Sequence, residues 1–535
     1  MLGALPIASH ASIGRATRAR AGTAPPQVPA IVPNPRHEKA EPGVFRLTAT
    51  TRLTVPANEP GAIRAAQALR RWLRRSTGLR LAPPTTTRPG RAASHPAIRF
   101  VRDGRVAIPR EGYRLVVSPQ GVVIEASSAA GWSYGAASLW QLVPLRPRAG
   151  VLAVPAVRID DAPRVPVRTL ELSIDGYRPS PREIRRLADL MTILKLKFLE
   201  EPARASATVD LDTRQSRAAD EPPGPARVLT LAEVYRAAAG GPAAVRGTVS
   251  TAWLGTDAQL EQRLLPRAAA LAEVGWSAPS RRHWRDFLRR LVVLDRHTRA
   301  LGLRSSRAAF RVRARVAIDF RAATALVRLS TQTGYGEIRY TLAGGMPQAD
   351  SAVYRGPLRV RLPVTLHAAD FAGNRRIGPI LTRRLDLATA QRRTSRALSL
   401  CTEYRPLWLE GEPSTAHRSA KFLLDATNPC WVYRAADLDA ARRIRVAVGR
   451  VRFPPSTHGA RRSPQATGTL VIRLDGCAGT PLARVPLPRK SDGITVLPTL
   501  PLPASVRGLH DLCVQLPRSA HGEQWALAWI APIPR

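Results

Sequence analysis

The sequence predicts a multidomain protein of mixed α/β and β structure, and three observations lead to this fold class. A chain of 535 residues is too long for one ordinary domain of roughly 100–200 residues. Up to residue 302, apolar residues at helical spacing alternate with short strand-like runs. From residue 324 onwards, short alternating strands separated by glycine turns replace the helices.

The N-terminal part is predicted to hold an irregular segment and then a small α+β domain. Residues 1–34 are rich in Ala, Pro and Arg and lack a clear apolar core of about 7–15 residues, so we expect disorder or a degraded export signal. Residues 35–160 begin with two short strands. These are followed by a helix within 61–79 that ends near Gly78, a strand pair within 111–128, and a second helix within 129–143.

Residues 161–305 are predicted to form a truncated (β/α) barrel of the TIM type. A strand at 167–174, a helix at 181–195 and a strand at 196–199 make a βαβ unit, with which a parallel barrel opens. Regular alternation stops after this unit and returns with a strand at 245–253 and two helices at 257–276 and 280–302. A typical barrel has roughly 250 residues. The shorter region would leave strand edges exposed, so self-association through these edges is expected.

Two β-sandwich-like domains are predicted at 315–385 and 395–535. All four cysteines lie in the second of them, an even number that is typical of two disulfides in a periplasmic or extracellular protein. No Cys-x-x-Cys pair and no spaced histidines occur, so the sequence predicts no metal site and no cofactor.

The formal net charge of +43 leaves two interpretations open. Clustered arginines would bind a polyanion, whereas a compositional bias would spread them over the whole chain. Only five of the 82 basic residues are lysine, the arginines occur throughout, and no nucleic-acid motif is present, which favours the bias. No specific nucleic-acid partner is expected, and no apolar run has the roughly 18 residues of a membrane span.

Five blocks in order resemble the family 20 glycoside hydrolases, the β-N-acetylhexosaminidases and chitobiases. EGYRLVVSPQGVVIEASSAAGWSYGAASLWQLV (111–143) is similar to their N-terminal domain. LLPRAAALAEVGWSAPSRRHWRDFLRRL (264–291) is similar to their closing barrel helices. The others are VLTLAEVYRAAAG (228–240), EIRYTLAGGMPQADSAVYRGPL (337–358) and the cysteine-containing tail from residue 401.

The resemblance implies retaining hydrolysis of terminal N-acetylhexosamine from glycans, with the substrate's own acetamido oxygen as nucleophile. An adjacent Asp-Glu pair at the end of the fourth barrel strand would orient the acetamide and protonate the leaving oxygen. The usual His-x-Gly-x-Asp-Glu setting of this pair is missing here. One Asp-Glu pair remains nearby, Asp220-Glu221, which is a catalytic candidate with ordinary loop acids as the alternative interpretation.

Other pocket positions implied by the resemblance have changed. Ser173, Gly176 and Tyr177 stand where the family has Asp-x-x-Arg-His, and Gly255 replaces a hydroxyl-binding Glu. Trp253 could stack on a sugar or pack in a core, and Asp212 could accept a hydroxyl hydrogen bond. The resemblance also implies disulfides between Cys401 and Cys430 and between Cys477 and Cys513.

The sequence therefore predicts a β-N-acetylhexosaminidase that is catalytically impaired because the Asp-Glu strand is absent. The alternative is a non-catalytic protein that binds carbohydrates or polyanions. Four tail tryptophans could supply a sugar platform to such a protein, although core packing is the simpler interpretation for residues that lie among apolar strand positions: Trp408, Trp431, Trp525 and Trp529.

Overall fold

A computed structural model provides the structure of the protein. It divides the chain into two compact units, 1–306 and 307–535. Within them, the described residues are 29–87, 96–102, 108–174, 176–199, 209–210, 212–213, 227–237, 244–251, 254–320, 322–342, 344–402, 406–410, 421–425, 428–439, 441–452, 468–488, 493–517 and 523–533.

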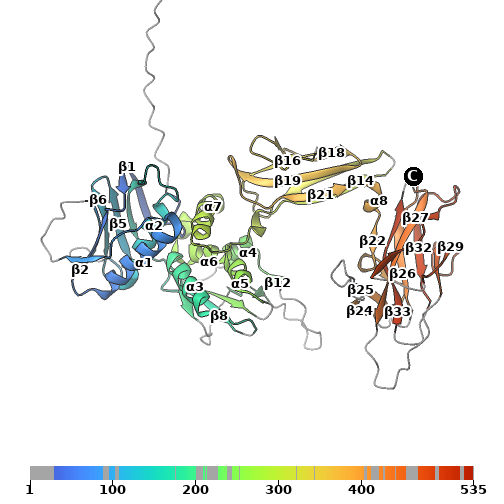
Figure 1. Ribbon diagram of the computed structural model, residues 1–535, viewed down its shortest axis with the longest axis horizontal. Coiled ribbons are helices and arrows are strands. Elements are labelled where there is room, and N and C mark those ends of the chain that lie inside the picture. Colours follow the sequence, from blue (N-terminus) through green and yellow to red (C-terminus); the bar gives the residue numbers. More distant parts are fainter. Residues whose placement is uncertain are drawn as a thin grey trace, which may run out of the picture. The chain divides into compact units, whose positions relative to one another are not determined.

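A seven-stranded mixed sheet forms the first part of the N-terminal unit, with the order β1-β7-β5-β6-β4-β2-β3 (Figure 1). Its central hairpin alternates buried and half-buried side chains, as a sheet with one covered face requires. The strands are β1 (His37–Leu47), β2 (Arg52–Pro56), β3 (Thr85–Thr87), β4 (Ala97–Arg102), β5 (Tyr113–Ser118), β6 (Gly121–Ala126) and β7 (Leu152–Asp161).

Two helices, α1 (Pro60–Thr77) and α2 (Ala129–Leu142), lie against this sheet and against each other (Figure 1). The first ends at Gly78, which adopts a left-handed φ of 80° that suits a residue without a Cβ, and this confirms the predicted stop. The second begins at Ser128, whose hydroxyl accepts a hydrogen bond from the Gly131 amide.

The predicted disorder of residues 1–34 is wrong for residues 29–34, because buried side chains satisfy their backbone groups. The Val32 amide donates to Gln141 Oε1, and the Asn34 amide donates to Glu273 Oε2. Arg290 Nη1 donates to the Ile31 carbonyl. The prediction rested on the local bias towards Ala and Pro. These hydrogen bonds join residues that are far apart in the sequence, so local patterns cannot reveal them.

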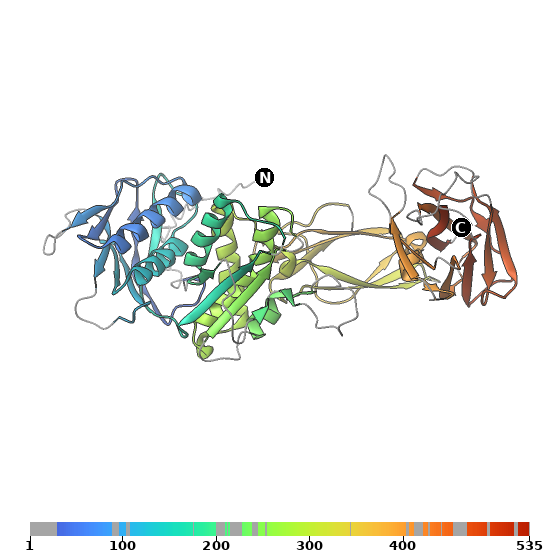
Figure 2. The same cartoon turned by 90° about the horizontal axis from the view of Figure 1, so that it is seen from below.

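A four-stranded sheet with parallel pairing follows, with the order β10-β13-β8-β9. Figure 2 shows its two long strands, β8 (Val167–Ser173) and β13 (Ala244–Ser250), side by side. Their register runs from Val167 opposite Ala244 to Ser173 opposite Ser250. The flanking strands are β9 (Lys197–Leu199) and β10 (Val209–Asp210), and a separate antiparallel pair joins β11 (Asp212–Thr213) to β12 (Arg227–Val228).

Helices cover this sheet, and one of them differs from the prediction. The single helix expected over 257–276 is broken into α5 (Asp257–Leu264) and α6 (Arg267–Trp276), because Pro266 lacks an amide hydrogen and cannot continue a helix. Every residue of α6 is buried. The remaining helices are α3 (Pro181–Ile193), α4 (Leu231–Ala237) and α7 (Trp284–Ala300).

The second unit begins with two antiparallel sheets around a small apolar core. The first sheet consists of β14 (Arg313–Asp319), β15 (Thr324–Ser330) and β18 (Leu358–Arg361). The second is built on β16 (Glu337–Thr341) and β19 (Val364–Ala372), with the edge strands β17 (Ala352–Val353), β20 (Arg375–Arg376) and β21 (Leu381–Leu385). A short helix, α8 (Leu387–Ala390), follows.

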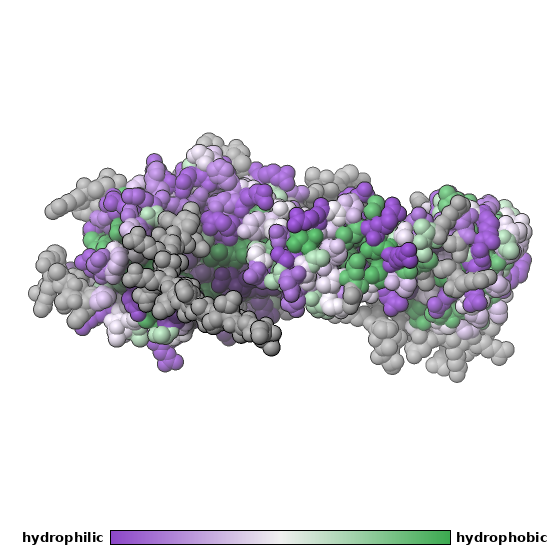
Figure 3. Space-filling view, turned by 90° about the horizontal axis from the view of Figure 1, so that it is seen from above, coloured by the Kyte–Doolittle hydropathy of each residue, from purple (hydrophilic) through white to green (hydrophobic). Residues whose placement is uncertain are grey.

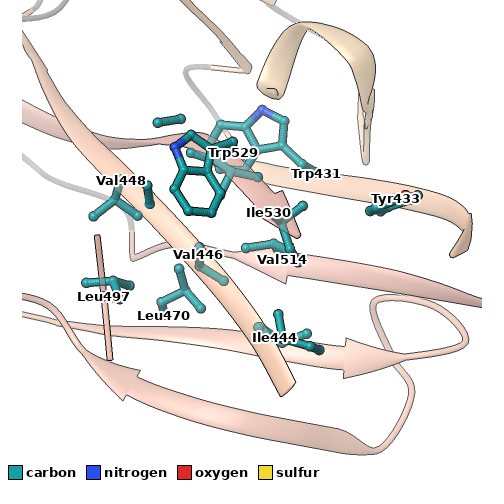
Figure 4. Packing of buried hydrophobic residues seen from close by; sticks show 14 of the residues in the cluster. Trp431, Tyr433, Ile444, Val446, Val448, Leu470, Leu497, Val514, Trp529 and Ile530 are labelled. Atoms are coloured by element: carbon teal, nitrogen blue, oxygen red, sulfur yellow. The ribbon is translucent and has the colours of Figure 1, made fainter. Parts of the chain in front are cut away.

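The tail contains two further antiparallel sheets around a larger core, in which Trp431 and Trp529 lie among aliphatic side chains (Figure 4). One sheet contains β22 (Arg393–Thr394), β33 (Glu523–Ile533), β27 (Arg443–Arg452), β30 (Ile494–Val496) and β31 (Leu500–Pro501). The other has the order β23 (Ser399–Leu400), β26 (Cys430–Asp437), β32 (Leu509–Gln515), β28 (Thr469–Leu474) and β29 (Pro481–Pro486). A separate pair joins β24 (Pro406–Glu410) to β25 (Lys421–Asp425).

The predicted class of multidomain α/β and β structure is thus confirmed. None of the described helices is both long and apolar enough to span a bilayer. On the face seen in Figure 3, hydrophilic residues occur in scattered groups that apolar residues interrupt.

Candidate functional site

The carboxyl ends of β8 and β13 are where a parallel α/β sheet usually carries its functional residues. Here Asp257, at the first turn of α5, joins this edge to the segment before α3. Tyr177 Oη donates to Asp257 Oδ1 at 2.7 Å, and Ser180 Oγ donates to Asp257 Oδ2 at 2.9 Å. The Tyr177 amide also donates to the Thr251 carbonyl just after β13.

These hydrogen bonds fix the charge state of Asp257. Burial acts to raise the pKa of its carboxyl, but the donors Tyr177 and Ser180 outweigh burial and hold the pKa below its ordinary value. The same hydrogen bond raises the pKa of Tyr177. A carboxylate that stays ionised and is occupied by two hydroxyl groups is a poor proton donor. Asp257 is therefore a structural link at this edge and does not resemble a general acid.

In the described part of the chain, the site residues that the sequence predicts do not lie together at this edge. Asp220, Glu221 and Trp253 lie outside the described residues. Asp212 lies in β11, whose backbone pairs with β12 in a separate ladder and not with the parallel sheet. Ser173 is the last residue of β8, and the exposed Gly176 follows shortly after it.

A buried polar cluster lies at the opposite, amino end of the parallel sheet. Lys195 and Asp161 have fully buried side chains, and Lys195 Nζ lies 2.8 Å from Asp161 Oδ2. Tyr113 Oη donates to the same oxygen at 2.6 Å, and Trp276 Nε1 donates to Oδ1 at 2.9 Å. Burial lowers the pKa of Lys195, and Asp161 opposes this shift. Each member comes from a different element, so the cluster joins the N-terminal sheet to the parallel sheet.

A second buried cation, Arg168 on β8, extends this cluster. Its guanidinium pairs with Glu111, donates to the Lys195 carbonyl and lies over the Trp276 ring at 5.0 Å. Lys197 Nζ approaches Glu111 from the other side at 2.9 Å. Sequence reasoning missed this cluster, although Lys195 and Lys197 were an available signal in a chain where arginine otherwise dominates.

A pair of buried carboxyl groups joins α3 to α5. Glu183 and Glu261 are each 1% exposed, and Arg186 contacts both, at 2.9 Å and 2.6 Å. Burial and the neighbouring charge of Glu261 raise the pKa of Glu183 to about 7. Because both groups are covered by protein, they are not accessible to a substrate, and their role is in helix packing.

In the tail, Cys401 is bonded to Cys430 and Cys477 to Cys513, which is the pairing that the resemblance implies. Trp431, Trp525 and Trp529 are 0%, 1% and 7% exposed. The guanidinium of Arg392 covers the Trp529 ring at 4.0 Å. These three tryptophans therefore belong to the core and form no open platform, and the side chain of Trp408 lies outside the described residues.

Two segments of the chain match known protein families. Residues 28–162 match the family described as glycosyl hydrolase family 20, domain 2, and residues 327–385 match the family described as Fn3 associated. A β-N-acetylhexosaminidase from Cellulomonas fimi is 31% identical over 122 residues, which are 21% of this chain and 24% of that protein. The aligned part thus spans about a quarter of this curated relative.

Solved structures with detectable similarity include an exo-β-N-acetylglucosaminidase and an N-acetyl-β-hexosaminidase. A GH20 exo-β-N-acetylglucosaminidase from Vibrio harveyi (inactive D437A mutant) is 13% identical with a TM-score of 0.40, covering 54% of this chain and 80% of that chain. An N-acetyl-β-hexosaminidase from Streptomyces plicatus is 16% identical with a TM-score of 0.37, covering 54% of this chain and 98% of that chain.

The buried ion pair gives a first prediction. Asp161→Asn leaves the Lys195 ammonium buried without its counter-ion, so we expect the N-terminal unit to lose about 3–5 kcal/mol of unfolding free energy. Asp160→Asn is the matched control, because this neighbouring side chain is 40% exposed and pairs with Arg114 and Arg158 at the surface. It should cost less than about 1 kcal/mol. Urea unfolding of both variants measures the difference, and equal losses would contradict a buried role for Asp161.

The carboxyl pair gives a second prediction, on pH. Because the pKa of Glu183 is raised in the folded chain from 4.5 to about 7, its contribution to stability is full below pH 4.5 and is lost as the pH rises through 7. Glu183→Gln mimics the protonated form, so it should stabilise α3 at pH 8 by on the order of 2 kcal/mol and leave it unchanged at pH 4. Urea-dependent hydrogen exchange of residues 181–193 measures this.

The control for the pH prediction is Glu41→Gln, at a side chain that is 37% exposed in the same unit. This substitution should change the unfolding free energy by the same small amount at pH 4 and at pH 8. A Glu183→Gln variant that behaves like Glu41→Gln at pH 4 and at pH 8 would disprove the assigned titration.

Proposed function

The chain belongs to glycosyl hydrolase family 20, and we propose that it is a catalytically impaired β-N-acetylhexosaminidase that retains its scaffold and has lost most of its hydrolytic power. The proposed ligands are glycans with terminal N-acetylglucosamine or N-acetylgalactosamine. The match of residues 28–162 to domain 2 of the family supports the glycan class. The Cellulomonas fimi relative, a β-N-acetylhexosaminidase, points to the same sugars.

The strand order β10-β13-β8-β9 is the observation that carries this proposal. In a closed eight-stranded parallel barrel, the first strand lies between the second strand and the last one. β8 lies between β9 and β13, so β13 corresponds to the last strand. We infer that the region is the beginning and the end of a barrel.

The length of chain between these strands then limits what can lie between them. Eight strand–helix units occupy about 250 residues, or about 30 residues each. Residues 200–243 separate β9 from β13 and have room for roughly one or two units. A complete barrel would need about five units there. With β10 next to β13, roughly one unit remains for strands three to six, and the fourth strand, which would carry the catalytic Asp-Glu pair, is one of these four.

The residues described at the carboxyl ends of β8 and β13 agree with this proposal. Asp257, which lies at this edge, is held ionised by Tyr177 and Ser180 and so is a poor proton donor for a leaving oxygen. Substrate-assisted hydrolysis needs both a proton donor and a carboxylate beside the acetamide. The neighbouring carboxyl groups described near this edge, those of Glu183 and Glu261, are each 1% exposed and so cannot reach a substrate.

A second candidate function, binding of an acidic glycan without hydrolysis, is favoured by one cavity in the second unit. The cavity has a volume of about 420 Å³, and its lining includes four arginines: Arg383, Arg384, Arg392 and Arg393. Asp386 is the one acidic side chain in the lining and lies 3.3 Å from Arg384. Burial together with the charge of Arg445 lowers the pKa of Arg392, as expected where cations outnumber anions.

Hydrolysis of chromogenic N-acetylglucosaminide and N-acetylgalactosaminide substrates tests the main proposal. We expect kcat/KM at least about 10²–10⁴-fold below that of the Cellulomonas fimi enzyme assayed in parallel, since general acid catalysis typically contributes this factor. The proposal is overturned if turnover is comparable with that enzyme and is abolished by Glu221→Gln. In that case Asp220-Glu221 would be a working catalytic pair.

Titration with sulfated or uronic-acid oligosaccharides at moderate salt tests the second candidate. Arg383→Ala/Arg384→Ala removes two cationic side chains from the cavity lining and should raise Kd about tenfold, or about 1.4 kcal/mol. Arg359→Ala/Arg361→Ala removes the same charge from exposed positions of β18 and is the matched control. Equal weakening by both variants, with loss of all binding at raised salt, would reduce the interaction to nonspecific charge.

A further inference from the structure

The four cysteines of the tail meet at one place in its second sheet. Cys430 begins β26 and Cys513 lies in β32, opposite Val432. Cys401 follows β23, which pairs with β26, and Cys477 lies in the turn after β28, which pairs with β32. All four sulfur atoms lie within 4.8 Å of one another. Two disulfides that only cross-link their own segments have no need to lie in contact in this way.

The distances between sulfurs of different disulfides are close to those of a tetrahedral metal site. Cys401 Sγ lies 3.2 Å from Cys477 Sγ and 3.8 Å from Cys513 Sγ. Cys430 Sγ lies 3.5 Å and 3.4 Å from the same two atoms. In tetrahedral tetrathiolate zinc, bonds of about 2.3 Å place sulfurs about 3.8 Å apart. One of the four distances equals this edge and the other three are shorter by 0.3–0.6 Å, so the sulfurs of different disulfides need to move apart only slightly to surround a metal ion.

We propose that this cysteine cluster, Cys401, Cys430, Cys477 and Cys513, is a redox-controlled binding site for one soft divalent cation of the zinc type. In the oxidised chain the cluster is two disulfides. A dithiol reductant delivers two electrons and two protons to each disulfide and is itself oxidised to a disulfide. Binding of the cation then forms four metal–sulfur bonds and releases four protons.

The surroundings of the cysteine cluster suit this chemistry. Cys430 and Cys513 are 1% and 0% exposed, whereas Cys401 and Cys477 are only half-buried, so a cation has a route from solvent. A tetrathiolate zinc centre carries two negative charges. Arg473 lies opposite Cys513 in the sheet, and its guanidinium donates to the Gly479 carbonyl, beside the turn that holds Cys477. This cation would stabilise the negative centre.

Both states of the cluster hold the same four segments together. The disulfides join Cys401 to β26 and the turn at Cys477 to β32, and the strand pairing of these segments does not depend on the sulfurs. Exchange between the two states therefore requires the sulfurs of each pair to separate, without a change in strand order. The cluster can act as a site in which the redox state decides whether metal is bound.

The test uses the full chain, reduced with a dithiol under nitrogen, freed of reductant and titrated with Zn²⁺ or Co²⁺. We expect one tightly bound ion per chain by elemental analysis, thiolate-to-Co²⁺ charge-transfer absorption, and loss of reactivity of all four thiols. The oxidised chain should bind none at this site. A reduced and folded chain that binds no stoichiometric metal overturns the proposal.

Cys477→Ser separates a metal site from adventitious binding. Its hydroxyl is a poor ligand for a soft cation, so the affinity for zinc should fall by at least about tenfold. Thr402→Ala, beside Cys401, is the control that should leave affinity unchanged. Far-ultraviolet circular dichroism of each reduced protein verifies folding. Equal affinity in Cys477→Ser and the reduced parent chain would show that the ion binds elsewhere and would also overturn the proposal.

Discussion

The two sheets of the N-terminal unit are joined at a buried ion pair, between Asp161 at the end of β7 and Lys195 in the turn between α3 and β9. A buried charge is tolerated only when it is paired and hydrogen-bonded. Asp161 meets this requirement, since it also accepts hydrogen bonds from Tyr113 and Trp276. Lys195 adopts a left-handed φ of 58°, an uncommon conformation for a residue with a side chain. The strain fits a turn whose position is set by the need to place the ammonium group beside Asp161.

This constraint explains why the N-terminal sheet and the parallel sheet form one compact unit rather than two domains. The polar cluster takes members from β5, β7 and α6 and from the chain before β9, so neither sheet can be moved without leaving a buried polar group unsatisfied. All of its members lie at the amino end of the parallel strands, away from the edge where catalysis takes place in α/β barrels. The groups that join the two sheets thus lie at the opposite end of the strands from that edge. The packing of the two sheets therefore does not depend on which residues stand at that edge.

The local elements were the predictable part of this structure. Helical spacing together with Gly78 located α1, and alternation around the Pro-Gln-Gly turn located β5 and β6. The predictions failed where distant groups decide the outcome. Residues 29–34 are held by side chains of Gln141, Glu273 and Arg290. At the candidate site, the role of Asp257 depends on Tyr177 and Ser180, which the chain brings to it only after folding. Pro266 was a readable local signal for the break between α5 and α6, but the apolar spacing on both sides outweighed it in the prediction.

The cysteine cluster was not predicted from the sequence for the same reason. Spacing along the chain argued against a metal site, because no two cysteines are separated by only two residues. Spacing of that kind is needed only when one loop must supply two ligands. In the tail, each ligand comes from its own segment, and the sheet order β23-β26-β32-β28 brings these segments together. The spacing of residues along the chain does not reveal a site assembled in this way, whether the site is the buried ion pair, the link at Asp257 or the cysteine cluster. Their chemistry can be recognised only after strand pairing has determined which residues are neighbours.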